Sequence, residues 1–523
     1  MNRKYSIPII FILLVFLLCG CVSKQKPEVT TQQPVEYNKV IQEADELYSR
    51  GCYICLKQAY ELYEQALSFP VFQKKTTKNL FKTAILLGLR ERELGILKET
   101  YFSKAEDIIA VSPYLVDYSV LLKIASTIPR KTVGVVGDLV EDSDRVIVSM
   151  DDVKADLEEW TELFKEKSKL EEIYAYVVIG FFPTFSYFIK EELDIESIEQ
   201  AFPDSPLIRY KLSILPKGNP LNLEKLAQDD PQFYEAFFFL GQKALKMRLL
   251  VTAEKNFLKA YEQIPESSSL VISLASIYFA FEELETSLGF YDKTLKMASA
   301  HRDALLGKAM CLSYLGRHKE AINICNNMLS LGKYYLGESH YWLAWNQNEL
   351  GEWKNAWENI ESSKKYLIGH GEVFFLAGLI AFNQQRLNDA EKNLLEANKQ
   401  DASNGDPSYY LGKLKNIQED WLNSGAYFEL ASSRYEIKEG MIQEKIKAIK
   451  DSDFSEERKK KHIARKTSLL RNIQLTKATA WYNAAAGFYN AGYPKKALQL
   501  AEKAASHNAL KAKAIELLQL MKK

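Results

Sequence analysis

The stretch from Tyr234 to Pro265, YEAFFFLGQKALKMRLLVTAEKNFLKAYEQIP, decides the fold of this chain. Small residues such as Gly241 and Ala253 occur where two antiparallel helices would cross closely, and large residues such as Phe257 fill the gaps between neighbouring pairs. Pro265 then ends the second helix, because proline cannot continue an α-helix. The stretch therefore predicts two short helices joined by a turn.

The small residue of the second helix recurs along the chain at an almost constant step. The positions are Ala253, Ser287, Ala321, Ala356, Ala390 and Ser424, and the successive intervals are 34, 34, 35, 34 and 34 residues. Two short antiparallel helices and two turns use about that many residues. The period therefore predicts consecutive helix pairs, an architecture that favours binding surfaces over reaction centres.

The same unit matches a family consensus. The pattern W-x2-L-G-x2-Y…A-x3-F…A…P is met here by Leu240, Gly241, Ala253, Phe257, Ala260 and Pro265. The chain thus resembles the tetratricopeptide repeat family, and the resemblance implies an all-α solenoid. Six consecutive repeats are expected over residues 231–438.

The flanking regions follow the repeat pattern less closely. Residues 39–128 are expected to be degenerate repeat-like helices, and residues 129–230 an irregular helical region with a loop or hairpin insertion rich in valine and glycine. Residues 439–523 are expected to hold an irregular charged helical segment, a final repeat and a capping helix. Because 73 residues separate Ser424 from Ala497, one irregular unit, about five residues longer than the period, is expected between them.

The N-terminal residues predict a targeting signal. An apolar run from Ile7 to Leu18 follows two basic residues and is too short for a stable membrane span. The residues Leu18-Cys19-Gly20-Cys21 resemble the bacterial lipobox, which implies that residues 1–20 are a signal peptide and that Cys21 is acylated. An ordinary secretory signal with a chance cysteine is the alternative.

The residues after the lipobox indicate where the mature protein lies. Residues 21–38 are rich in Pro, Thr and Gln and predict a flexible tether. By resemblance to enterobacterial lipoproteins, Val22 in place of aspartate favours the outer membrane over the inner membrane. The sequence therefore predicts a lipid-anchored protein of the bacterial envelope.

The amino-acid composition limits which kinds of partner and which kinds of chemistry are expected. The chain has 68 basic and 68 acidic residues and 47% hydrophobic residues, so a packed core is feasible and a nucleic-acid partner is not expected. The six histidines show neither metal-ligand spacing nor a catalytic motif. We expect no enzymatic activity, no bound metal and no cofactor.

Two pairs of cysteines remain after the signal region. Cys52 and Cys55 form a Cys-x-x-Cys motif at a predicted turn, where packing as small apolar residues, a local disulfide, and redox or metal chemistry are all open. Cys311 and Cys325 lie in facing helices of one repeat and are expected to be buried thiols.

The family resemblance also implies a set of groove residues. In tetratricopeptide proteins, positions 2, 5, 9, 12 and 13 of the repeat line the concave face. Carried onto this chain, those positions include Phe238, Phe279, Met310, Tyr314, Tyr341, Trp345, Asn348, Phe375, Phe382, Asn383, Tyr409, Asn416, Tyr482, Tyr489 and Asn490. Aromatic rings provide contact area and asparagines can pair with a peptide backbone, so a groove for a polypeptide is predicted. Burial of these aromatics against loops or a neighbouring helix is the alternative.

The distribution of basic residues indicates which kinds of partner to expect. Ser276, Met310, Trp345 and Leu379 stand at position 9, so the basic clamp that holds chaperone C-termini in some family members is not expected. Arg458-Lys-Lys-Lys461-His462, with Arg465, Lys466 and Arg471, is a strongly basic cluster. It is interpreted as a solvated helix face or as a contact for anionic lipid or an acidic partner.

These features together predict a membrane-anchored scaffold that mediates protein–protein interaction in the bacterial envelope. The partners expected are a polypeptide on the concave face and the membrane at the N-terminal lipid. An alternative is a glycan- or nutrient-binding outer-membrane lipoprotein, similar to the starch-binding family that also uses tetratricopeptide helices.

Overall fold

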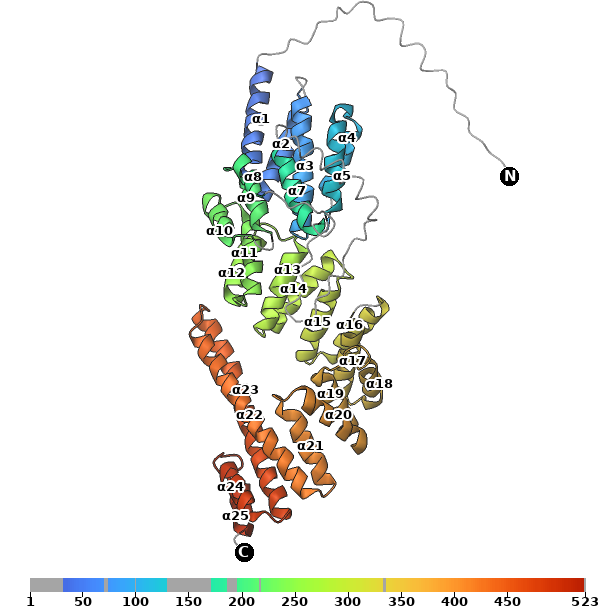
Figure 1. Cartoon of the computed structure of the whole chain (residues 1–523), viewed down its shortest axis with the longest axis vertical. Coiled ribbons are helices and arrows are strands. Elements are labelled where there is room, and N and C mark those ends of the chain that lie inside the picture. Colours follow the sequence, from blue (N-terminus) through green and yellow to red (C-terminus); the bar gives the residue numbers. More distant parts are fainter. Residues whose placement is uncertain are drawn as a thin grey trace, which may run out of the picture.

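The computed structural model describes residues 32–69, 74–98, 100–128, 171–185, 195–215, 218–332 and 335–521. The chain is helical throughout these ranges apart from turns and one isolated bridge, so the predicted all-α class is confirmed (Figure 1). Cys21, the signal peptide 1–20, most of the predicted tether and the insertion predicted near 129–149 lie outside the described residues. No helix in the described part is both long enough and apolar enough to cross a bilayer.

The N-terminal helices form a module at one end of the molecule (Figure 1). They are α1 (Gln32–Arg50), α2 (Tyr53–Ala66), α3 (Lys74–Glu93), α4 (Thr100–Ala110), the 3₁₀ helix η1 (Pro113–Tyr118), α5 (Ser119–Thr127), α7 (Glu172–Phe185), α8 (Ile195–Ala201), α9 (Pro206–Ser213) and α10 (Pro220–Asp229). Helix α3 is the central element, with most of its side chains buried. One continuous apolar core runs from this module into the first repeats.

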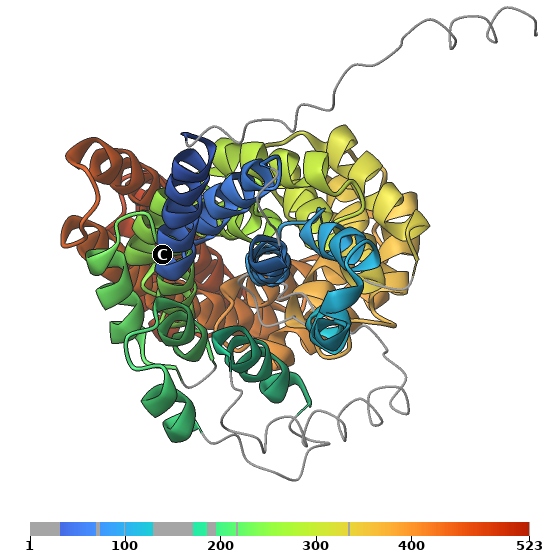
Figure 2. The ribbon, with the colours of Figure 1, turned by 90° about the horizontal axis from the view of Figure 1, so that it is seen from above.

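Six antiparallel helix pairs follow. They are α11 (Tyr234–Lys246) with α12 (Leu250–Tyr261), α13 (Ser268–Ala280) with α14 (Leu284–Met297), α15 (Arg302–Tyr314) with α16 (His318–Ser330), α17 (Leu336–Glu349) with α18 (Trp353–Ser363), α19 (Gly371–Asn383) with α20 (Leu387–Gln400), and α21 (Gly405–Ile417) with α22 (Trp421–Lys450). The pairs stack into a curved row that forms a ring when viewed along the long axis (Figure 2). The first helices of neighbouring pairs contact one another directly from α13 to α21, as expected for the inner layer.

The recurring small residue lies at the crossing of each pair. Ala253, Ser287 and Ser424 are fully buried there. The Ser287 hydroxyl donates to the Ala275 carbonyl at 2.7 Å, and the Ser424 hydroxyl donates to the Gly412 carbonyl at 3.0 Å. Serine can therefore replace alanine because its hydroxyl is satisfied by the backbone of the partner helix.

The C-terminal region differs from the irregular repeat that the sequence predicted. The second helix of the sixth pair and the first helix of the last pair are both lengthened, to 30 residues in α22 and 35 in α23 (Glu456–Asn490). They form one long hairpin, followed by α24 (Pro494–Ala505) and α25 (Lys511–Met521). No proline lies between Pro407 and Pro494, which permits the lengthening but does not explain it, since residues 266–406 also lack proline and their helices keep the usual repeat length.

The base of this hairpin is a contact between two glycines. A Cβ placed on Gly487 would lie 2.8 Å from the backbone nitrogen of Gly425, so the two helices meet backbone to backbone. Gly440, in the middle of α22, has no atom within 4 Å of an added Cβ. Substitutions at these two positions therefore distinguish the effect of close packing, at Gly487, from the effect of the low helix propensity of glycine, at Gly440.

We expect Gly487→Ala to lower the free energy of unfolding by about 1–3 kcal/mol, because the helices must move apart. Gly440→Ala is the matched control and should raise the free energy of unfolding by about 0.5–1 kcal/mol, as alanine is the better helix former. Urea denaturation followed by circular dichroism measures both. A stabilising Gly487→Ala would contradict the backbone contact.

A buried charged cluster joins the N-terminal module to the first repeat. Arg90 of α3 is fully buried, and its guanidinium carbon lies 3.4 Å from the ring centroid of Tyr210 in α9. Its Nη1 lies 3.6 Å from the Glu235 carboxylate at the start of α11, and its Nη2 donates to the Gly51 carbonyl at 2.9 Å. Arg90 thus connects three parts of the fold.

Glu93 completes the same cluster one turn further along α3. Its carboxylate accepts hydrogen bonds from Tyr176 at 2.8 Å and Tyr210 at 3.1 Å, and it pairs with Lys211. These side chains are at most 6% exposed. The cluster therefore holds two basic and two acidic side chains in a site that water does not reach.

Candidate partner-binding surface

The predicted groove residues from Phe279 to Asn416 all lie on the first helices of their pairs. These residues are Phe279 on α13, Met310 and Tyr314 on α15, Tyr341, Trp345 and Asn348 on α17, Phe375, Phe382 and Asn383 on α19, and Tyr409 and Asn416 on α21. Most are half-buried, whereas Tyr314 is 56% exposed and Asn416 is also exposed. Five consecutive inner helices thus contribute to one surface.

Aromatic rings connect neighbouring helices along this surface. The ring centroids of Phe279 and Tyr314 lie 6.0 Å apart, and those of Tyr314 and Trp345 lie 6.1 Å apart. These contacts bridge α13, α15 and α17. Because Phe279, Tyr314 and Trp345 are each packed by a ring from a neighbouring pair, this part of the surface is preorganised rather than a set of free side chains.

Two aromatic residues that the repeat positions did not predict complete the row. Trp342 is 7% exposed and contacts Tyr314 at 5.5 Å and Trp345 at 5.8 Å between ring centroids. Tyr410 lies 5.9 Å from Phe375 and 5.6 Å from Phe382. Trp342 directly follows Tyr341, and Tyr410 directly follows Tyr409, both of which were predicted groove residues. A large aromatic residue next to a groove position could therefore have identified them from the sequence.

The asparagines differ in how much of their amide is available. The Asn383 amide donates to Asn348 Oδ1 at 3.1 Å, and Asn348 is only 9% exposed. Asn348 therefore supports Asn383 from an adjacent helix, and its predicted role as a direct contact is corrected. Asn383 is half-buried and Asn416 is exposed, so direct contact of these two asparagines with a ligand stays a prediction.

Phe238 is also corrected. Its side chain is fully buried, with ring centroids 5.0 Å from Phe239 and 6.0 Å from Phe257. The first pair packs against the N-terminal module, so a position that faces the groove in a middle repeat is covered here. The open surface therefore begins at α13.

The surface is electrically neutral over its tyrosines. Burial raises the pKa of Tyr314, of Tyr341 and of Tyr409, so all three phenols keep their proton at ordinary pH. Lys413 lies 5.0 Å from the Tyr410 ring centroid and supplies a cation beside the row. Neutral phenols, amides and ring surfaces offer contact area and hydrogen bonds for a ligand.

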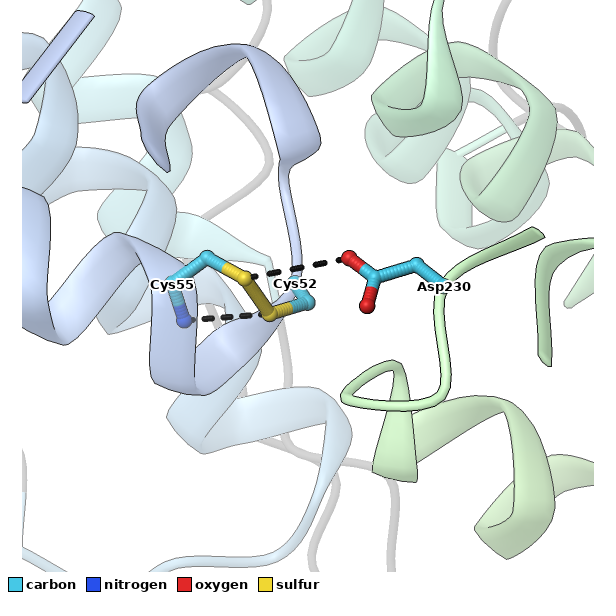
Figure 3. Close-up of side chains that lie close together, drawn as sticks. All are labelled: Cys52, Cys55 and Asp230. Atoms are coloured by element: carbon cyan, nitrogen blue, oxygen red, sulfur yellow. Dashed lines mark hydrogen bonds between the residues drawn. A yellow bond between two sulfur atoms is a disulfide. The ribbon is translucent and has the colours of Figure 1, made fainter. Parts of the chain in front are cut away.

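The Cys52–Cys55 motif lies far from this surface and forms a disulfide (Figure 3). Cys52 caps α2, and Asp230 Oδ2 lies 4.0 Å from Cys55 Sγ. Arg50 holds the Asp230 carboxylate through two hydrogen bonds of 3.0 and 2.8 Å. Within the described ranges these cysteines and Asp230 are the one group with metal-ligand proximity, but both sulfurs are engaged in the bond. The disulfide turn thus packs beside the loop that leads into the first repeat.

Cys311 and Cys325 are both buried free thiols. The Cys311 thiol donates to Ser287 Oγ at 3.4 Å. Burial raises the pKa of Cys311 to about 11 and that of Cys325 to about 12, so both are protonated and unreactive at neutral pH.

Solved structures similar to this chain are tetratricopeptide repeat proteins. YrrB, described as a TPR protein with an unusual peptide-binding site, is 24% identical over 35% of this chain and 93% of its own, with a TM-score of 0.29. PilF from Pseudomonas aeruginosa is 18% identical over 37% of this chain and 88% of its own, with a TM-score of 0.34. A tetratricopeptide repeat protein from Parabacteroides merdae is 13% identical over 52% of this chain and 98% of its own, with a TM-score of 0.36. No family model and no curated protein matches the sequence.

Proposed function

We propose that this chain is a tetratricopeptide-type scaffold that binds a partner polypeptide along the inner face of α13 to α21. The observation that carries the proposal is the aromatic row, in which rings of α13, α15 and α17 contact one another, rings of α19 and α21 contact one another, and the amides of Asn348 and Asn383 join α17 to α19. Aromatic residues are enriched at the centres of protein interfaces, and amides can pair with a peptide backbone. A preorganised surface of this kind also binds at low entropic cost.

A photo-crosslinker tests where the partner binds. With p-benzoylphenylalanine in place of Tyr314, we expect crosslinks to a discrete protein in intact cells. Tyr366 is the matched control, because it is 55% exposed against 56% for Tyr314 but follows α18 on the outer layer. The double variant Tyr341→Ala, Trp345→Ala should reduce the Tyr314 crosslink by about tenfold or more, since truncated central aromatics often cost 2 kcal/mol or more of binding. Equal crosslinking from Tyr314 and Tyr366 would reject the inner face as the binding surface.

We further propose that the scaffold is held at the membrane of a bacterial envelope, on the outer membrane, by acylation of Cys21. The lipobox-like residues before Cys21 support this, and acyl chains contribute about 0.8 kcal/mol per buried methylene.

The variant Cys21→Ser should lose metabolic labelling with a radioactive fatty acid and move from the membrane fraction to the soluble fraction. Cys52→Ser is the control and should stay labelled. Persistent membrane association of unlabelled Cys21→Ser would show that another element holds the protein there.

A further inference from the structure

The tip of the long C-terminal hairpin lies against α12 to α14, about 200 residues earlier in the chain (Figure 1). Arg458 is at the centre of this contact: its Nη1 donates to Glu254 at 2.6 Å and its Nε to Glu283 at 2.7 Å. His462 Nε2 lies 2.9 Å from the same Glu283 oxygen. One arginine therefore joins α12 to the turn before α14.

Further contacts flank Arg458. Arg465 donates to the backbone carbonyl of Glu282, and Lys466 pairs with the Glu282 carboxylate. The rings of Phe454 and Phe281 meet edge to face at 5.0 Å. We call this contact the clasp: residues 454–466 of the hairpin tip, with Glu254 and residues 278–283 as its receptor.

The clasp gives the basic cluster a role that neither interpretation from the sequence included. Arg458, Arg465 and Lys466 face acidic groups of the same chain, whereas Lys460 and Lys461 are exposed. Glu282 has φ +61°, as do the equivalent turn residues Arg248, Gln385 and Glu419 at about +60°, so the left-handed turn belongs to the repeat, and the clasp uses its carbonyl as the acceptor for Arg465.

The clasp closes the row of repeats on itself. The inner helices run from α13 to α21, and the hairpin returns from α21 to the beginning of the row (Figures 1 and 2). A 35-residue helix is about 52 Å long at 1.5 Å per residue. The hairpin of α22 and α23, which we call the strap, is therefore long enough to reach from the sixth pair back to α12–α14.

The two helices of the strap are held together by contacts that do not involve the clasp. These contacts are made by Ile442, Ile473 and the pair Glu439–Lys477. The clasp, in contrast, consists of ion pairs and a few aromatic rings at the tip. Opening it would expose no aliphatic core. The pairs of Glu282 with Arg465 and Lys466 weaken with salt, because the Glu282 side chain is 44% exposed, whereas Arg458, Glu254 and Glu283 are at most 19% exposed and are screened less.

We propose that the clasp opens and closes reversibly, so that the strap admits a continuous polypeptide sideways onto the inner face and then encloses it. The identity of the ligand as a polypeptide rests on the proposed function. The movement of the strap does not depend on it. A ring that stayed closed would accept only a free chain end.

Distances between spin labels on full-length protein test the movement. Labels at Lys461→Cys on the strap and Thr286→Cys on α14 should give one short distance in low salt and a growing long-distance population in 1 M NaCl. Arg458→Glu with Lys466→Glu should make the long distance dominant at all salt concentrations. Lys460→Glu is the matched charge reversal on the exposed face and should change nothing.

A charge exchange separates opening from misfolding. Adding Glu283→Arg and Glu282→Lys to the two reversals should restore the short distance, which a misfolded strap would not do. An unchanged short distance in 1 M NaCl and in the double reversal would overturn the proposal. So would a salt-induced dimer by light scattering, which would mean that straps exchange between copies.

A locked variant links the strap to the partner. Glu282→Cys with Lys466→Cys, oxidised to a disulfide, should abolish crosslinking from position 314, and reduction should restore it. Undiminished crosslinking in the locked state would overturn sideways entry while leaving the proposed function intact. An absence of any crosslink from the unlocked protein would instead count against the proposed function alone.

Discussion

Replacing Arg90 with leucine is expected to lower the free energy of unfolding at pH 8 by about 3–5 kcal/mol. Arg90 is fully buried beside Glu235 and Glu93, at 3.6 and 3.9 Å from their carboxylates. Leucine would fill part of the space but leave two acidic groups with a single buried cation, Lys211. Uncompensated charge in a site without water is among the largest costs that a substitution can impose.

The matched control is Arg317→Leu. Arg317 also pairs with a glutamate, Glu320 at 2.7 Å, but both side chains are about half exposed to solvent. Exposed ion pairs contribute little to stability, because water and salt screen them, so this variant should unfold close to the wild type. Urea denaturation of the two variants measures the difference. Equal losses would show that the buried cluster adds nothing beyond a surface ion pair.

The cluster matters for function because of where it lies. It fixes α3 and α9 of the N-terminal module onto α11, the first helix of the repeats. The module joins the N-terminal end of the chain to the repeats, so its attachment fixes how that end is held relative to the inner face. Loss of Arg90 should therefore loosen the tether end of the molecule before the middle repeats.

Much of the repeat architecture could be predicted because its determinants are local. The step between Ala253 and Ser424 reports helix crossings, and each crossing is decided by residues within one period. Even the serines at this step follow from local geometry, since Ser287 bonds a carbonyl 12 residues earlier. Such contacts leave a periodic trace in the sequence.

The clasp and the buried cluster produce no periodic pattern in the sequence. Arg458 is paired with Glu254, 204 residues away, and in the sequence it stands in a run of cations that is typical of a solvated face. Arg90 and Glu93 similarly occur in the charged run RERE, which is common at a helix end. A single sequence does not tell which surfaces the superhelix brings together, so these partners were found only in the structure.

The groove residues could be predicted from the sequence only in part. The repeat positions correctly place Tyr314 and Trp345 on inner helices, but they missed Trp342 and included the buried Phe238. Adjacent residues on a helix point about 100° apart, so a large ring one position away still reaches the same surface. The repeat position of a residue therefore predicts that it lies on an inner helix more reliably than it predicts that its side chain is exposed on the groove surface.

Glu235 should make the stability of the junction depend on pH. Burial is the largest influence and raises the pKa of Glu235 to about 7, although Arg90 and the Tyr53 amide, which donates at 2.7 Å, act in the opposite direction. In the unfolded chain a glutamate has a pKa of about 4.3. The folded state therefore holds the proton more tightly, and this contribution to stability is complete below about pH 4.3 and is lost as the pH rises through about 7.

The comparison with Glu235→Gln isolates this group from the other titrating residues. Glutamine keeps the oxygen that accepts from Tyr53 but carries no charge at any pH. The free energy of unfolding of the wild type, minus that of Glu235→Gln, should fall by about 3 kcal/mol between pH 4.5 and pH 8, at 1.36 kcal/mol per pKa unit. Urea denaturation across this range measures it. A difference that is constant or rises with pH would mean that Arg90 outweighs burial and keeps Glu235 ionised, which would make the pair a permanent ionic joint between α3 and α11.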